Sequence, residues 1–225
     1  MPENYYSSLK SLLNVLTDPG TVFEKVIGKS EFASPALILC GFNALLAVIL
    51  LPKIRAAALW MAEHSTVAIS PSAKALIPVT ATIAAFVGAV LAPLLIWLVV
   101  AQVLKFYGDL HKSGQSLGTF FTVAVYGYVP MAIGALIAAG IALATPVENF
   151  KRVTVSLAMF MPYTKSFTYA FSTRLNPFTW WSIALWSTGG GKALKKAPFG
   201  LAIYLFGLWL IYSLVSTYFV YSQLT

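Results

Sequence analysis

Long apolar stretches dominate the chain, and they restrict its fold more than any other feature. A helix that crosses a bilayer needs about 20 mostly apolar residues. Four stretches reach or approach that length, namely residues 35–52, 75–104, 117–145 and 199–220. The chain is 59% hydrophobic and only 10% charged, whereas a soluble domain carries roughly 25% charged residues. Polar groups are therefore too few to cover a globular surface, and a polytopic membrane protein is expected.

A fifth, shorter span is expected at residues 176–194. Asn176 is a good helix cap and Pro177 suits the first turn. From there to Thr188 is only about 18 Å of helix, less than the hydrocarbon core of roughly 30 Å. The helix could continue through the following glycines to Leu194, begin earlier within "SFTYAFSTRL", or be a half-span buried among its neighbours. We favour a short, full-crossing helix that uses part of "GGGKAL".

These segments predict an all-α polytopic bundle of five transmembrane helices over residues 34–225. Residues 1–33 precede it and hold two amphipathic segments, in which apolar residues recur at helical spacing. Such helices either lie on the membrane surface or pack on the end of the bundle. Residues 153–171 are apolar, but Pro162 and Lys165 argue against a span. We expect an interfacial or re-entrant segment there.

Five spans place the two termini on opposite sides of the membrane. Lysine and arginine favour the cytoplasmic side, but the two sides hold eight and seven such residues and the count does not decide. Three lysines gather in the short stretch 189–198. This density favours a cytoplasmic N-terminus.

The run "GGGK" at residues 189–192 raises the question of a phosphate site. A P-loop needs G-x-x-x-x-G-K-[ST] between a strand and a helix. Here Trp186 replaces the first glycine, Ala193 replaces the hydroxyl residue, and no strand precedes the run. We interpret it as a flexible turn with membrane-proximal lysines. Lys192, Lys195 and Lys196 are then candidate contacts for a lipid headgroup or a partner, since each basic residue near an anionic surface contributes about 1 kcal/mol.

Catalytic chemistry is sparse in this sequence. The two histidines, His64 and His111, fall in expected loops, and Cys40 has no polar partner at helical spacing. We find no metal-ligand spacing and no ionisable residue at bilayer depth in the four long apolar spans. We therefore expect no enzyme, no cofactor and no metal. Basic residues spread over loops on both sides also argue against nucleic-acid binding.

Small residues recur every four positions in two spans. They are Ala84, Gly88 and Ala92 in the second span, and Gly134, Ala138 and Ala142 in the third. Small residues let helix backbones approach closely. The pattern predicts packing within the chain, with a dimer face as the alternative.

Polar and kinking residues mark two more positions inside the spans. Asn43 is expected to make an interhelical hydrogen bond, with an ion site as the less favoured reading. "YGYVP" places Tyr126, Tyr128 and the helix-kinking Pro130 together. Proline frees a carbonyl one turn back, which a tyrosine, a threonine or water must satisfy. A kinked, partly polar pocket is the alternative there.

Three motifs, in order, resemble the Yip family of Ypt-interacting, five-span membrane proteins, and most of all its short bacterial members. They are "LTDPGTVFEKV" before the first span, "YGYVP" in the third, and "NPFTWWSIALW" followed by glycines and "KALKKA" before the last. The resemblance covers residues 13–221 and implies a cytoplasmic N-terminus. Eukaryotic members are associated with Rab-type GTPases and carry a long polar N-terminal region. Only about 33 residues precede the first span here, which favours a prokaryotic plasma membrane.

Two functional hypotheses follow from these patterns and from the resemblance. The first is a non-enzymatic scaffold or adaptor that binds membrane proteins or a second copy of itself. The second is a lipid-handling or small-solute transport protein, in which the kinked spans, the tyrosine pair and the lysines form a groove for lipid. Anionic membrane lipids are expected partners in both.

Overall fold

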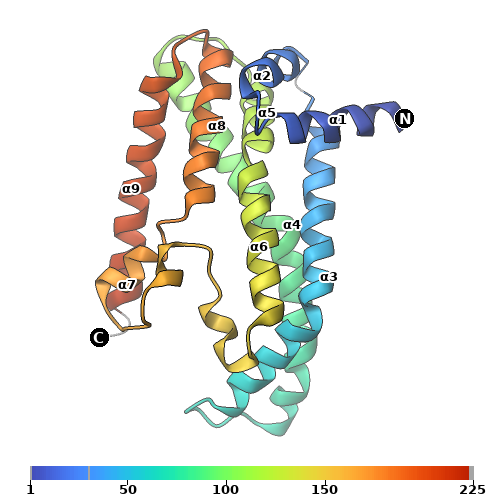
Figure 1. Cartoon of the computed structure of the whole chain (residues 1–225), viewed down its shortest axis with the longest axis vertical. Coiled ribbons are helices and arrows are strands. Elements are labelled where there is room, and N and C mark those ends of the chain that lie inside the picture. Colours follow the sequence, from blue (N-terminus) through green and yellow to red (C-terminus); the bar gives the residue numbers. More distant parts are fainter. Residues whose placement is uncertain (1, 30, 223–225) are drawn as a thin grey trace.

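The structure, a computed structural model, describes residues 2–29 and 31–222. Residues 1, 30 and 223–225, which fall within the two predicted regions 1–33 and 34–225, lie outside the described residues. Every regular element in the described part is helical, which confirms the all-α bundle (Figure 1). The elements are α1 Pro2–Asn14, α2 Pro19–Ile27, α3 Ala33–Glu63, α4 Pro71–Leu110, α5 Leu117–Gly127, α6 Val129–Ala144, η1 Val147–Arg152, η2 Leu157–Phe160, α7 Phe167–Ser172, α8 Pro177–Leu194 and α9 Pro198–Ser222.

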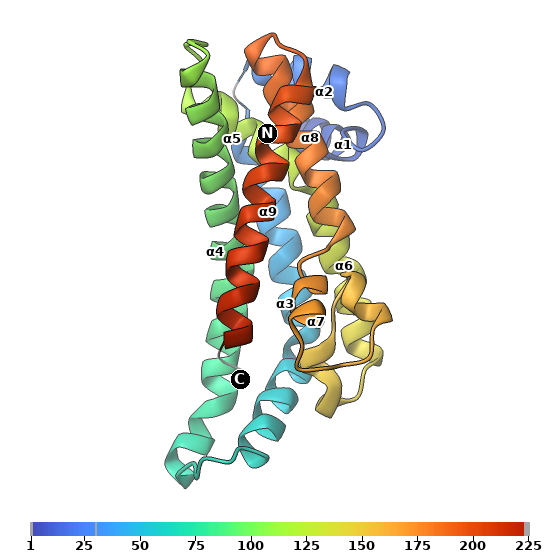
Figure 2. The same ribbon diagram turned by 90° about the vertical axis from the view of Figure 1, so that its left-hand side faces the viewer.

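The long helices run up and down the bundle beside one another. The chain descends through α3, returns through α4, descends again through α5 and α6, rises through α8 and descends through α9 in the view of Figure 1. Helices α1 and α2 lie at the end where α8 turns into α9, which we call the amino-terminal end. The α3–α4 hairpin extends furthest at the opposite end, as the view turned by 90° also shows (Figure 2).

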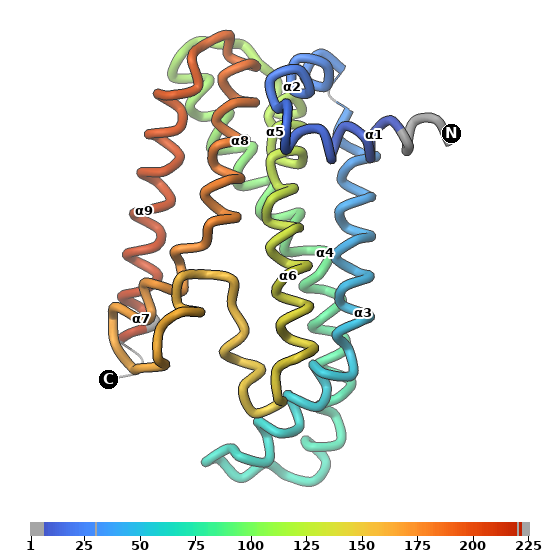
Figure 3. Tube along the Cα trace, viewed as in Figure 1, coloured from blue at the N-terminus to red at the C-terminus, as the bar shows by residue number. Residues whose placement is uncertain are grey.

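Four helical segments are long and apolar enough to cross a membrane. They are α3, α4, α5 with α6 (Leu117–Ala144), and α9 (Pro198–Phe219). Helix α8 does not meet that standard in the described residues, because its 18 residues include glycines, hydroxyl side chains and Lys192. It is about 27 Å long. The chain between α6 and α8 rises along the bundle as η1, η2 and α7 (Figure 3).

Helix α8 begins at the predicted cap and continues through the glycines. The Asn176 side chain accepts a hydrogen bond from the backbone N–H of Phe178 at 2.9 Å, and the helix ends at Leu194. The interpretation of "GGGK" as a flexible turn is therefore wrong. Gly189, Gly190 and Gly191 are helical and buried.

The reversal between α8 and α9 lies at Lys195 instead. Lys195 has the left-handed conformation, with φ 54°. The N–H of Lys196 donates to the carbonyl of Gly191 at 2.9 Å, and that of Lys195 to Lys192 at 3.2 Å. This is the Schellman pattern, which usually has glycine at the left-handed position. A lysine there places positive charge beside the negative end of the helix dipole.

The three glycines bring α8 into close contact with its neighbours. A Cβ added to Gly189 would lie 2.7 Å from Phe23 of α2 and 2.8 Å from Val123 of α5. One added to Gly190 would overlap Leu201 of α9. The role of this glycine run is therefore close packing and not flexibility. The missing side chains let α2, α5 and α9 approach the same turn of α8.

The amino-terminal helices pack on the end of the bundle. Helix α1 contacts α3, and α2 contacts α5 and α8. The side chains that face the bundle are buried, namely Leu12 of α1, Val15 directly after it, and Val22, Phe23 and Val26 of α2. Leu9 and Leu13 of α1 remain exposed on the other side. The two helices are thus part of the folded core, with an apolar edge of α1 left uncovered.

We expect Gly189→Ala to destabilise the protein by about 1–3 kcal/mol, because the added methyl group overpacks the contact with Phe23 and Val123. The measurement is the free energy of unfolding of the purified protein in mixed micelles, followed by circular dichroism. Gly207→Ala in α9 is the matched control, since nothing lies within 4 Å of a Cβ added there. Equal stability of the two variants would contradict the packing role of Gly189.

Candidate functional site

The third span is broken at the predicted kink. Helix α5 ends at Gly127, α6 begins at Val129, and Tyr128 stands between them. The N–H of Tyr128 donates to the carbonyl of Val125 at 3.2 Å. The carbonyl of Ala124, its usual partner in an α-helix, accepts instead from the indole N–H of Trp186 in α8 at 3.0 Å. The donor at the break is therefore a tryptophan from another helix. Our prediction concerned a different carbonyl, that of Tyr126, which lies one turn before Pro130.

Gly127 makes room for that tryptophan. A Cβ added at Gly127 would overlap Cδ1 of the Trp186 ring, and would lie 2.5 Å from its Nε1. Trp186 is itself buried. The break, the glycine and the indole form one junction between α5 and α8. Sequence reasoning did not single out Trp186, because its partner lies 62 residues away.

Tyr126, Tyr128 and Asn43 are buried within the bundle. The rings of Tyr128 and Trp97 meet edge to face, with centroids 5.6 Å apart. The amide nitrogen of Asn43 and the indole nitrogen of Trp97 have no hydrogen-bond partner among the residues that the structure describes.

The two rows of small residues have opposite surroundings. Gly134 packs against the ring of Phe178, since an added Cβ would lie 2.8 Å from that ring. Ala138 is half-buried on the same helix. Ala84, Gly88 and Ala92 are all exposed on α4, and nothing lies within 4 Å of a Cβ added to Gly88. The α4 row does not pack within the chain.

The candidate lysines lie at the amino-terminal end and are exposed. Lys192 forms an ion pair with Glu24 of α2. Exposed pairs of this kind contribute about 0–1 kcal/mol. Lys195 and Lys196 have no ion-pair partner in the described part of the chain. Because Tyr126 and Tyr128 are buried in the core, they and the lysines do not share one surface groove.

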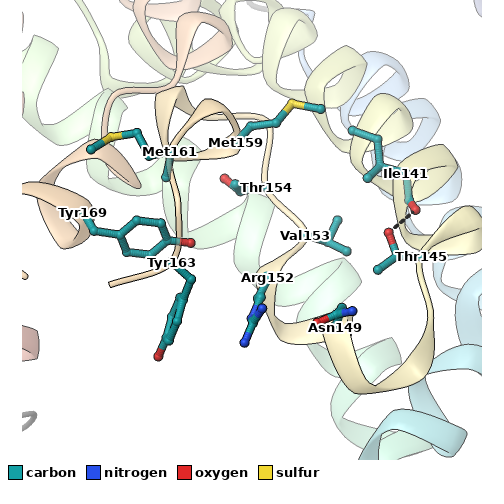
Figure 4. A pocket seen from close by; sticks show the side chains of 11 residues that line it. Ile141, Thr145, Asn149, Arg152, Val153, Thr154, Met159, Met161, Tyr163 and Tyr169 are labelled. Atoms are coloured by element: carbon teal, nitrogen blue, oxygen red, sulfur yellow. Dashed lines mark hydrogen bonds between the residues drawn. The ribbon is translucent and has the colours of Figure 1, made fainter. Parts of the chain in front are cut away.

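A cavity lies instead at the opposite end of the bundle, where α6 ends. It has a volume of about 240 Å³ and continues into a second hollow that shares several of its residues. Figure 4 shows Ile141 on α6, Thr145 directly after that helix, Asn149 and Arg152 on η1, and Tyr163 and Tyr169 beyond them. The guanidinium of Arg152 lies over the Tyr163 ring, 4.7 Å from its centroid. Sequence reasoning placed an interfacial segment here but named none of these residues.

Within the described residues, no group of three histidine, cysteine, aspartate or glutamate side chains is arranged to hold a metal ion.

Fold and composition together define the class of the protein. It is a polytopic, all-helical integral membrane protein.

Comparison with known families assigns the chain more closely. The sequence model of the Yip1 domain matches residues 13–220. Because this match covers nearly the whole chain, the protein belongs to the Yip family. Searches of curated proteins and of solved structures each found no match.

We expect Trp186→Phe to destabilise the protein by about 1–3 kcal/mol, because the carbonyl of Ala124 loses its indole donor in a buried place. Trp181→Phe on the same helix is the control, since Trp181 is 40% exposed. Both variants are compared with the parent protein by circular-dichroism unfolding in mixed micelles. If the two variants unfold alike, the hydrogen bond to Ala124 is not a stabilising contact.

Proposed function

We propose that the protein is a non-enzymatic scaffold or adaptor, which binds another membrane protein through the outer face of α4 and through its cytoplasmic surface. The partner is a second membrane protein or another copy of the chain. We place it in a prokaryotic plasma membrane with the N-terminus in the cytoplasm. Helices α1 and α2 and the lysines of the α8–α9 turn would then face the cytoplasm together.

The observation that carries this proposal is the uncovered face of α4. Ala84, Gly88 and Ala92 lie one turn apart, and their exposure leaves a shallow strip along the helix. Large apolar side chains border it, among them the exposed Ile83, Val87 and Leu91. A second helix can approach closely over the small residues while the larger side chains pack around it. At Gly134, by contrast, the space beside the glycine is already filled by Phe178 of the same chain.

The cytoplasmic part of the proposed surface is basic. Lys195 and Lys196 are exposed beside the end of α8. Anionic lipid headgroups or acidic segments of a partner are the groups that such lysines attract. Lys192 is already held by Glu24, so Lys195 and Lys196 are the more available of the three.

Gly88→Leu should weaken partner binding roughly tenfold, because a large side chain there holds the second helix away from α4 at a cost of about 1–3 kcal/mol. The measurement is the amount of stoichiometric partner that remains bound after purification in mild detergent. Gly207→Leu on α9 is the control, since it also has open space around it.

The fold should survive Gly88→Leu, and its unfolding curve should match that of the parent protein. Gly134→Leu should instead disrupt the fold, because Phe178 occupies that space. Undiminished partner binding by a folded Gly88→Leu protein would rule out the α4 face as the docking surface.

A lipid-handling or small-solute transport protein is the second candidate. The predicted groove of tyrosines and lysines is not formed and gives this function no support. The cavity at the end of α6 does support it. That cavity joins an apolar wall, which includes Ile141, Met159 and Met161, to the polar groups of Arg152 and Asn149. A hollow of this character suits an amphiphilic molecule.

For this second candidate we expect reconstituted vesicles to move lipid or solute faster than protein-free vesicles. The rate should fall when Lys192, Lys195 and Lys196 are replaced together by Gln, because the lysines concentrate anionic headgroups by about 1 kcal/mol each. Fluorescent-lipid accessibility in vesicles measures the rate. Movement no faster than in protein-free vesicles would eliminate this function.

A further inference from the structure

The cavity at the end of α6 has a continuous lining that is polar on one side and apolar on the other. Its two hollows share five residues, namely Arg152, Val153, Thr154, Tyr163 and Tyr169. Ile141, Ala158, Met159 and Met161 form the apolar wall. Methionine side chains adapt to irregular apolar ligands. The arrangement suits a molecule with a polar head and an apolar chain.

The polar side of the cavity carries uncompensated positive charge. Arg152 and Lys151 line it, and neither forms an ion pair with a carboxylate in the described residues. Glu148 lines the second hollow as well, so two positive charges face one negative charge. The Arg152 guanidinium lies over the Tyr163 ring, within the range of a cation–π interaction. Its edge N–H groups stay available for the oxygens of a phosphate.

The cavity lies at the end of the third candidate membrane span. The apolar segment Leu117–Ala144 ends at its wall, and Thr145 already belongs to the lining. The chain that closes the cavity exposes large apolar side chains, with Phe160 at 82% and Met159 at 51% exposure. Exposed apolar side chains beside a membrane span are expected to contact lipid. Phospholipid headgroups are the anions that surround a protein at that depth.

We propose that the cavity at the end of α6 binds an anionic phospholipid of the leaflet opposite the amino-terminal helices. Its phosphate lies against Arg152, and an acyl chain follows the wall of Ile141, Met159 and Met161. This inference goes beyond the adaptor function, and it holds whether or not lipid moves across the bilayer. A free phosphate ester would satisfy Arg152 as well, but it would leave the apolar wall empty.

The experiment titrates the full chain, stripped of lipid in detergent, with dioleoylphosphatidylglycerol and counts bound lipid by native mass spectrometry. Dioleoylphosphatidylcholine, which has no net charge, should bind more weakly. Arg152→Gln should weaken binding of the phosphatidylglycerol about fivefold, the effect of one basic residue near an anionic headgroup. Lys165→Gln is the control, because Lys165 is exposed in the same segment but does not line the cavity.

A second variant tests the apolar wall without changing charge. Val153→Trp fills the space that the two hollows share, and it should weaken phosphatidylglycerol binding as strongly as Arg152→Gln does. Circular-dichroism unfolding checks that both variants are folded. Binding by Val153→Trp equal to that of the parent protein would overturn the proposal.

Two further outcomes would also overturn it. An equal loss of binding in Arg152→Gln and Lys165→Gln would mean that the lipid responds to overall charge and not to this cavity. Displacement of the lipid by glycerol 3-phosphate at equal concentration would mean that a free phosphate ester is the ligand. Weak or absent competition by glycerol 3-phosphate supports the phospholipid.

Discussion

The close approach of α8 to its neighbours is the contact on which the rest of the bundle depends. Gly189 and Gly190 have no side chains, and so Phe23, Val123 and Leu201 reach the α8 backbone. One turn earlier, Trp186 fills the space over Gly127 and donates to the carbonyl of Ala124. Helix α8 carries polar groups that would be unfavourable in contact with lipid. Its contacts with α2, α5, α6 and α9 shield these groups from lipid. A helix that falls short of the standard for a membrane span is thereby packed at the centre of its neighbours.

Much of the fold was predictable because it follows from local chemistry. Span lengths depend only on runs of apolar residues, and the start of α8 depends on Asn176 and Pro177, which act within one turn. The glycine run was interpreted wrongly for the same reason. Glycine by itself favours a turn over a helix, and only residues far away in the sequence, such as Phe23 and Val123, show that the backbone there is packed. The donor to Ala124 was missed because Trp186 gives no local sign of its partner.

In the candidate site, too, the sequence pattern did not show which distant residues a helix face contacts. Gly88 and Gly134 have the same spacing of small neighbours, yet one is uncovered and the other lies under Phe178. Periodicity tells which residues share a helix face, but not what that face meets. The cavity at the end of α6 was not foreseen, because irregular chain brings Arg152 and Tyr163 together. The adjacent basic residues at 151 and 152, at the end of an apolar span, were the available signal.

The ion pair between Glu24 and Lys192 joins residues that are 168 positions apart. Ribosomes add about 5–20 residues per second, so α2 exists for roughly ten to thirty seconds before α8 does. During that time Val22, Phe23 and Val26 lack the part of their surroundings that α8 supplies in the finished protein. An amphipathic helix in this position rests on the lipid surface. We expect this segment to lie on the membrane surface first and to pack on the bundle once α8 has been synthesised.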